Sequence, residues 1–256
     1  MYNFFAGIGN TSFRTFGPLH IFLMAFVLIG AILIFVFRDK LRNFKYKENV
    51  RYIMGTVLLL NMVVYFAGMF LTNTFSVFED LPLHLCFVTN FVMIYVLFKG
   101  DRKLYKIVYF FTFIGPMPAI IWTDLKYSYD VYEFWQFVIC HHLMLLTSIY
   151  LLVVLRYKVE AKNMIKAFII GMSYIIVINI GNKIFGTNYI MMTSLPDNVL
   201  GLYPFLVHIT PIIPLIFVGV LAFLFSYFPA YYISKLDNRD NIETISELEE
   251  HKEKIA

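Results

Sequence analysis

The chain has 256 residues, of which 60% are hydrophobic and 15% are charged, and its formal net charge is +4. A soluble domain needs more charge to cover its surface, so this composition excludes a soluble globular protein and indicates a polytopic membrane protein. The basic residues lie in predicted loops, where they report orientation in a membrane and not binding to a nucleic acid. Two cysteines are too few for a disulfide framework. The first apolar segment is too long for a cleavable signal peptide.

Seven apolar segments are long enough for a helix to cross a bilayer, which takes about 20 residues. Their continuous apolarity does not fit the alternating pattern of a barrel strand, so we predict an all-α bundle of seven transmembrane helices. In chain order the predicted spans are Leu19–Phe37, Tyr52–Leu71, Leu83–Phe98, Leu104–Trp122, Tyr132–Leu155, Met164–Ile184 and Phe205–Phe228. The transmembrane domain is predicted to cover residues 1–234. Residues 235–256 form a polar cytoplasmic tail, predicted as a short surface helix or as disordered.

Basic residues alternate between the two ends of these spans. All but three of the 21 lysines and arginines follow the first, third, fifth or seventh span. The exceptions are Arg14, Lys126 and Lys183. Because basic loops stay in the cytoplasm, the N-terminus is predicted outside and the C-terminus inside a multi-pass protein of the cell membrane.

Polar residues and prolines gather in the outer half of this predicted bundle. Every histidine except the one in the tail falls there. Pro116 and Pro118 interrupt the outer half of the fourth span, and Pro211 and Pro214 interrupt that of the seventh. Prolines free backbone carbonyls, which is tolerated in a membrane where the backbone lines a cavity. We therefore expect a cavity open toward the outer leaflet, although such residues also pack helices together.

Cys86, near the outer end of the third span, and His141, in the outer half of the fifth, are the predicted catalytic pair. A thiolate is a good nucleophile, and a neighbouring imidazole takes the thiol proton and later protonates the leaving group. Transfer through a thioester suits the movement of fatty acyl chains and requires no cofactor. The alternative is that Cys86 is a small hydrophobic side chain.

The residues predicted to lie near Cys86 and His141 have more than one possible role. Cys140 is expected to pack in the core, and a disulfide with Cys86 is the alternative at the oxidising outer face. His142 lies 100° around the helix from His141, so only one of the two rings should face the cavity. The predicted supporting residues are His84, Asn90, Gln136, His142, His20, Asp124 and His208.

Four residues near the end of the sixth span are the predicted substrate-binding set: Asn182, Lys183, Asn188 and Tyr189. The ammonium group of Lys183 would neutralise a lipid phosphate, or it would simply extend to the membrane interface.

Two other classes of function remain open. The first is a metal-dependent lipid hydrolase, although no two histidines have the spacing that places two ligands on one helix face. Its ligands would come from His20, His84, His141 or His142, His208 and Asp124. The second is a transporter or binding protein, although acidic residues are missing from the middle of the predicted membrane.

Several motifs occur in the order found in a known family. They are Phe16-Gly-Pro-Leu-His20, Leu81-Pro-Leu-His-Leu-Cys86, Phe134-Trp-Gln-Phe-Val-Ile-Cys-His-His142, Asn182-Lys-x-x-Gly186-x-Asn-Tyr189 and Leu200-Gly-x-Tyr-Pro204. With these motifs the chain resembles the YwaF-type bacterial integral membrane proteins.

Animal relatives of the YwaF-type proteins are implicated as acyltransferases that place polyunsaturated chains on ether phospholipids. The resemblance implies that Cys86 and His141 carry the chemistry. His142 stands where the family pattern has glycine, and Thr123-Asp124 lacks the proline of the usual Thr-Pro-Asp. The expected function is a membrane lipid acyltransferase or transacylase, with a phospholipid or lysolipid as substrate. The oligomeric state remains open.

Overall fold

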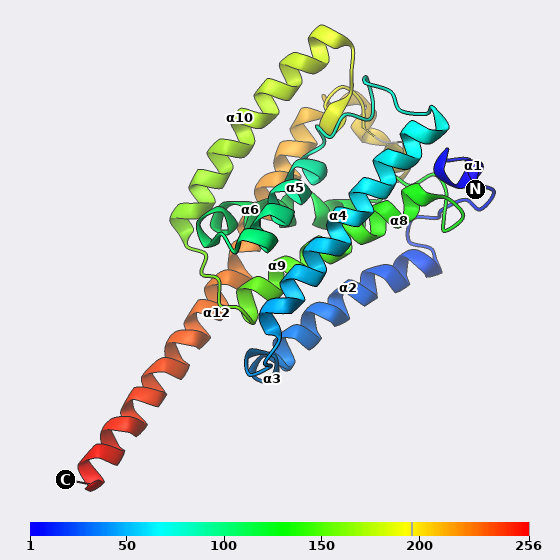
Figure 1. Cartoon of the computed structure of the whole chain (residues 1–256). Helices are drawn as coiled ribbons and strands as arrows, with labels where there is room; N and C mark the ends of the chain where they lie inside the picture. Colours follow the sequence, from blue (N-terminus) through cyan, green and yellow to red (C-terminus); the bar gives the residue numbers. More distant parts are fainter. Residues whose placement is uncertain (196, 256) are drawn as a thin grey trace.

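The computed structural model describes residues 1–195 and 197–255, and within them the chain is helical apart from loops and one isolated bridge, Ser12 to Tyr127 (Figure 1). The elements are α1 (Tyr2–Phe5), α2 (Pro18–Val36), α3 (Arg38–Arg42), α4 (Lys47–Thr72), α5 (Leu85–Lys99), α6 (Arg102–Ile114), α7 (Pro116–Ile121), α8 (Tyr132–Val138), the π-helical turn η1 (Ile139–Leu143), α9 (Met144–Val153), α10 (Ala161–Phe185), the 3₁₀ turn η2 (Tyr189–Met191), α11 (Asp197–Leu202), the 3₁₀ turn η3 (Pro204–His208) and α12 (Ile212–Ile255). The prediction of an all-α protein is confirmed.

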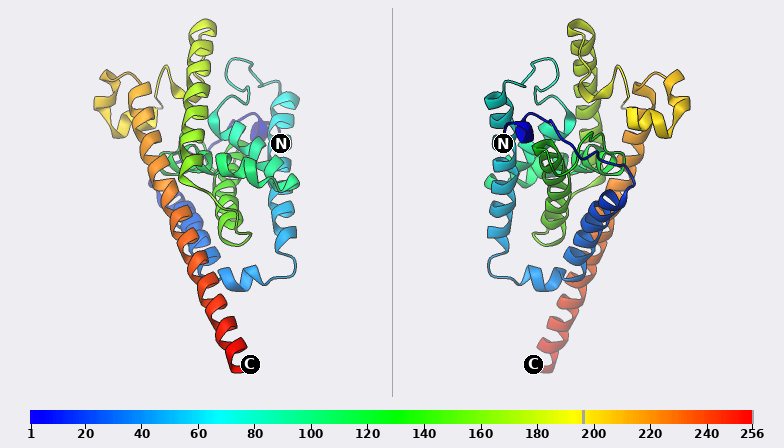
Figure 2. Two further views of the ribbon diagram at one scale, coloured as in Figure 1. Left: turned by 90° about the vertical axis from the view of Figure 1, so that its left-hand side faces the viewer. Right: turned by 90° about the vertical axis from the view of Figure 1, so that its right-hand side faces the viewer.

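Six helical segments in the described chain are long and apolar enough to cross a membrane: Pro18–Val36, Lys47–Thr72, Arg102–Ile121, Tyr132–Val153, Ala161–Phe185 and Ile216–Asn238. The third predicted span corresponds to α5, which has only 15 residues. At 1.5 Å per residue α5 is about 22 Å long, which is less than the roughly 30 Å of a bilayer core. Figure 2 shows that α5 and α6 are steeply inclined to α4 and α10.

Prolines were predicted to interrupt two spans, and the structure shows a different effect in each. Pro116 has no N–H to continue α6, and the chain breaks at Gly115 before α7 begins, as predicted. The prediction for the seventh span was wrong at both ends. Residues up to His208 form η3, and Pro211 precedes α12, while Pro214 lies in its first turn, where a missing N–H costs nothing. The helix then continues to Ile255, so the tail is helical and extends away from the other helices (Figure 1).

Local signals in the sequence fix several helix ends. The Asp101 carboxylate accepts hydrogen bonds from the N–H groups of Lys103 and Leu104 and so starts α6. Glu160 starts α10 as a capping box with its third helical residue. Gly100 and Gly186 end α5 and α10 with φ of +67°, a conformation in which other residues are strained.

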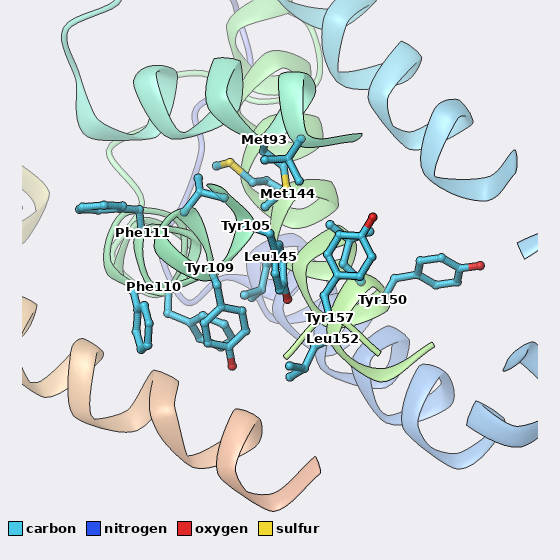
Figure 3. Packing of buried hydrophobic residues seen from close by; sticks show 14 of the residues in the cluster. Met93, Tyr105, Tyr109, Phe110, Phe111, Met144, Leu145, Tyr150, Leu152 and Tyr157 are labelled. Carbon is cyan, nitrogen blue, oxygen red and sulfur yellow. The ribbon is translucent and has the colours of Figure 1, made fainter. Parts of the chain in front are cut away.

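The hydrophobic core surrounds α6, which packs against α5, α9, α10 and α12. Figure 3 shows Tyr105 and Tyr109 of α6 among buried methionine, leucine and phenylalanine side chains. The hydroxyl of Tyr105 donates to the Ser148 carbonyl at 2.7 Å, and that of Tyr109 donates to the Ser226 carbonyl at 2.8 Å. These bonds give the two buried phenols a partner, since an unpaired polar group in an apolar core costs free energy.

Basic side chains join the loops at one end of the bundle. Arg42 donates to the carbonyl of Val153 at 2.9 Å and pairs with Asp237 of α12 at 2.8 Å. Arg51 at the start of α4 donates to the Leu97 carbonyl of α5. Lys106 and Lys162 both pair with Glu160, at 2.9 and 2.6 Å. The predicted cytoplasmic loops are therefore gathered together at the same end of the molecule.

Candidate functional site

A cavity of about 830 Å³ lies at the other end of the molecule. The first turn of α5, the break between α6 and α7, the α8–η1 segment, α10 and α12 all contribute to its wall, and residues between Ile190 and Leu206 cover it. Its volume lies within the range of small-molecule and cofactor sites. The walls are mostly apolar, so the cavity suits a ligand with a substantial hydrocarbon part.

Cys86 reaches the cavity from the second position of α5. His84 precedes the helix in an extended conformation, which turns the chain into α5. The backbone of Cys86 packs closely against Gly115, where an added Cβ would lie 3.8 Å from the Cys86 amide nitrogen. The break between α6 and α7 thus supports the first turn of α5, and the thiol is left half-buried at the cavity wall.

His141 reaches the same cavity from η1, the π-helical turn between α8 and α9. Its Nδ1 lies 2.8 Å from the carbonyl oxygen of Phe137, and its side chain is only 4% exposed. A carbonyl only accepts, so Nδ1 carries the proton and Nε2 is the acceptor of the ring. Single π-helical turns inside α-helices are rare and occur frequently at functional sites. Because α5 packs against η1, the thiol and this imidazole belong to neighbouring walls.

The rings of His142 and His20 have hydrogen-bond partners away from the cavity. His142 bonds through Nδ1 to the Val138 carbonyl at 3.0 Å and is directed toward α2, within electrostatic range of His20. Both ring nitrogens of His20 are engaged, Nδ1 with the N–H of Phe16 at 2.8 Å and Nε2 with the Ile120 carbonyl at 2.7 Å. Neither ring lines the cavity as described, so His141 is the one of the adjacent pair that does.

Of the remaining predicted supporting residues, some line the cavity and others do not. His84, Gln136 and Asp124 line the cavity. Asn90 does not: it is fully buried, and its side-chain amide has no hydrogen-bond partner among the described residues. His208 lies exposed at the end of η3 and is also absent from the described cavity wall.

Comparison with known proteins identifies the family of this chain. A family model described as the TMEM164 family matches residues 15–230, from the segment before α2 into α12.

The chain belongs to the TMEM164 family. The matched region contains all of the cavity wall, including Cys86 and His141. Membership of the TMEM164 family and the six apolar segments make it a multi-pass membrane protein. The search of curated proteins and the search of solved structures both found no match.

The predicted substrate-binding set of this TMEM164-family protein holds a loop together. The side chain of Asn182 bonds to Thr187 and to both backbone groups of Tyr189, at 2.7 to 3.0 Å. The Tyr189 hydroxyl donates to the Val77 carbonyl at 2.9 Å, and Asn188 bonds to residues 193 and 194. Lys183 is exposed. Within the described structure none of the four lines the cavity, and the α10 residues that do are all apolar.

Four residues that the sequence analysis did not single out line the mouth of the cavity: Tyr65, Glu79, Asp80 and Glu133. With Asp124 they give the TMEM164-family cavity an acidic mouth, and none of its described wall residues is lysine or arginine. Burial raises the pKa of the Asp80 carboxyl, which accepts a hydrogen bond from the Ser76 N–H at 2.7 Å. The position of Glu133, three residues before Gln136 and eight before His141, was the available signal, since this spacing keeps all three on one face.

The two cysteines of the chain are both free. Cys140 is fully buried in the hydrophobic core, as expected, and the alternative of a disulfide with Cys86 is wrong. Among the described residues, no three histidine, cysteine, aspartate or glutamate side chains are arranged to hold a metal ion. The histidines predicted as metal ligands are dispersed: His20 of α2 bonds to Phe16 and Ile120, His142 is directed toward α2, and His208 is exposed on η3.

Proposed function

We propose that this protein transfers acyl chains between membrane lipids through a thioester on Cys86, with His141 as general base and acid. One observation carries the proposal: the thiol of Cys86 on α5 and the imidazole of His141 on η1 line the same largely apolar cavity. Membership of the TMEM164 family gives the membrane setting, and the resemblance to the YwaF-type proteins and their animal relatives supports the reaction class.

The proposed first half-reaction forms the thioester. Nε2 of His141 takes the thiol proton, the sulfur attacks the ester carbonyl of a donor lipid, and the carbon–oxygen bond breaks. The departing lipid oxygen receives the proton from His141, which yields a lysolipid. In the second half-reaction the hydroxyl of an acceptor lysolipid gives its proton to His141 and attacks the thioester. The acceptor leaves acylated, and the Cys86 thiol is restored.

The first turn of α5 offers a donor for the developing oxyanion. The first N–H groups of a helix have no partner inside the helix. The hydrogen bonds of the described backbone use the N–H groups of Phe87 and Val88, which donate to His84, and do not use that of Cys86. A backbone N–H beside the attacked carbonyl stabilises the tetrahedral intermediate. Gln136, 5% exposed at the cavity wall, and His84 are the proposed additional donors.

We also propose that α5, the third apolar segment in chain order, crosses the membrane in addition to the six longer segments, with the N-terminus outside and the C-terminus in the cytoplasm. The gathering of the loops around Arg42, Arg51 and Lys106 at one end supports this arrangement, because basic loops remain cytoplasmic. The cavity at the opposite end then faces the outer leaflet. Because α5 has only 15 residues and is steeply inclined, this arrangement requires the bilayer around it to be locally thinner.

Acyl exchange in nanodiscs tests this function. The protein is supplied with a diacyl phospholipid and an isotope-labelled lysophospholipid, and labelled diacyl product is measured by mass spectrometry. We expect Cys86→Ala to abolish transfer and His141→Gln to slow it by about 10²- to 10⁴-fold, the usual contribution of general acid–base catalysis. Cys140→Ala and His142→Gln are the matched controls. A hydroxylamine-sensitive acyl adduct on Cys86 is also expected, and transfer by Cys86→Ala at the wild-type rate would refute the proposal.

A further inference from the structure

The cavity touches α10 and α12 in different ways. From α10 it is lined by Phe168, Gly171, Met172 and Ile175, whose spacing is that of a single helix face. From α12 it is lined by every residue from Ile216 to Leu221. Successive helical residues are 100° apart, so six consecutive residues point in all directions around the axis. The cavity therefore reaches more of α12 than the single face by which it touches α10.

The outer half of α12 is only loosely joined to the rest of the molecule. Phe217 is 64% exposed, and the first buried side chain described in α12 is Ala222. Farther along, Phe223 packs against Phe168 of α10, with ring centroids 5.7 Å apart. Figure 2 shows α10 and α12 close together near the middle of the molecule and diverging toward the end that carries the cavity. The cavity thus has an opening alongside residues 216–221, in a segment apolar enough to lie in a membrane.

The two ends of the cavity differ in chemistry. Its carboxylates come from the loop before α5, from Asp124 and from α8. The part of the wall contributed by α6, α10 and α12 is entirely apolar, and it includes Phe111, Gly171 and Gly219. A bilayer places hydrocarbon chains, and no water, against the outer side of α12. The occupant that matches this apolar arm is therefore a lipid hydrocarbon chain.

We infer that the opening alongside α12 admits the hydrocarbon chain of a bilayer lipid sideways into the cavity, where the chain lies against Gly219. The inference rests on the proposed function only in that the ester end of the same lipid would reach Cys86. Gly219 sets the free space at the opening, because an added Cβ there has only one atom within reach, Ile114 Cγ2 at 4.0 Å. The Cβ of a larger side chain at this position meets no clash, and the rest of that side chain would extend into the chain's path.

Photo-crosslinking tests the inference directly. The protein is placed in phosphatidylcholine vesicles that contain a diacyl phosphatidylcholine with a diazirine in the middle of one chain, and is illuminated. Crosslinks at Phe111 and Ile114, on the inner wall of the cavity, are counted by peptide mass spectrometry. Crosslinks on α2, whose side chains Ile21 and Phe22 are exposed, serve as the internal standard for contact with the bilayer.

The wild-type protein is expected to show inner-wall crosslinks. Gly219→Phe lowers them by about tenfold relative to α2, because the ring displaces about two methylene groups of the chain. Gly181→Phe is the matched control: it changes a glycine of α10 with no atom within 4 Å of an added Cβ and outside the described cavity wall, so the ratio stays at the wild-type value. Equal inner-wall crosslinking in Gly219→Phe and wild type, or crosslinks confined to exposed residues, would overturn the inference.

The same measurement in Cys86→Ala separates this inference from the catalytic proposal. Chain entry needs no thiol, so Cys86→Ala is expected to keep the wild-type crosslinking ratio. If Cys86→Ala retains both crosslinking and acyl transfer, the catalytic proposal fails and the side opening stands. If Gly219→Phe transfers acyl chains at the wild-type rate and crosslinks normally, the side opening fails and the catalytic proposal stands.

Discussion

The pair of Arg42 and Asp237 allows a quantitative test of how α12 is held to the bundle. Both residues are 7% exposed, and Arg42 Nη2 lies 2.8 Å from Asp237 Oδ1. Breaking a buried ion pair by removing one partner typically costs about 3–5 kcal/mol, because the other charge is left uncompensated. In Asp237→Asn the guanidinium keeps the Val153 carbonyl at 2.9 Å and Asp39 at 3.6 Å. We therefore expect the lower end of the range, about 3 kcal/mol.

Replacing the arginine is expected to cost more. In Arg42→Met the Asp237 carboxylate keeps, among the described residues, only Arg156, 3.9 Å away and half-exposed, and the Val153 carbonyl loses its side-chain donor. The expected loss is about 4 kcal/mol. The double variant Arg42→Met/Asp237→Asn removes both charges, leaves neither uncompensated, and should cost no more than the costlier single change. The coupling between the two sites is then several kcal/mol.

Equilibrium unfolding in mixed micelles of mild detergent and sodium dodecyl sulfate measures these free energies. Lys40→Met changes an exposed residue of the same short helix α3. It is the control and should change stability by less than about 0.5 kcal/mol. The argument fails if Asp237→Asn costs less than about 1 kcal/mol, or if the two single costs add in the double variant.

Three further outcomes are expected. Two lysines hold the pKa of Glu160 at about 2, so its contribution to stability is present above about pH 4.3, the ordinary value for glutamate, and is lost as pH falls toward 2. The melting temperature of Glu160→Gln should therefore be lower than that of the wild type at pH 7, and the two should converge near pH 2. Tyr109→Phe removes the bond to the Ser226 carbonyl and should lower unfolding free energy by about 1–2 kcal/mol in denaturant titrations. Asn182→Ala removes three bonds to the loop around Tyr189, and hydrogen exchange there should accelerate at least tenfold while α6 stays protected.

The sequence by itself determined the elements that follow from composition along the chain. Long apolar runs must form helices in a membrane, and five of the six long ones do so at nearly the predicted positions, while the last begins later than predicted. Pro116 has no N–H with which to continue α6, and the break at Gly115 follows. Depth along a helix is also linear in residue number, so Cys86 and His141 were both expected near one end of the bundle, and both line the cavity there.

Only the tertiary structure decided which way each helix face turns. His141 and His142 have the same depth and chemistry, and packing against α2 draws His142 away from the cavity. Asn182 was predicted to bind substrate, yet its side chain bonds to its own loop, while Glu133 and Asp80 line the cavity mouth. Rotation of a helix about its axis and its inclination to its neighbours depend on contacts between segments far apart in sequence, and no local pattern encodes those contacts.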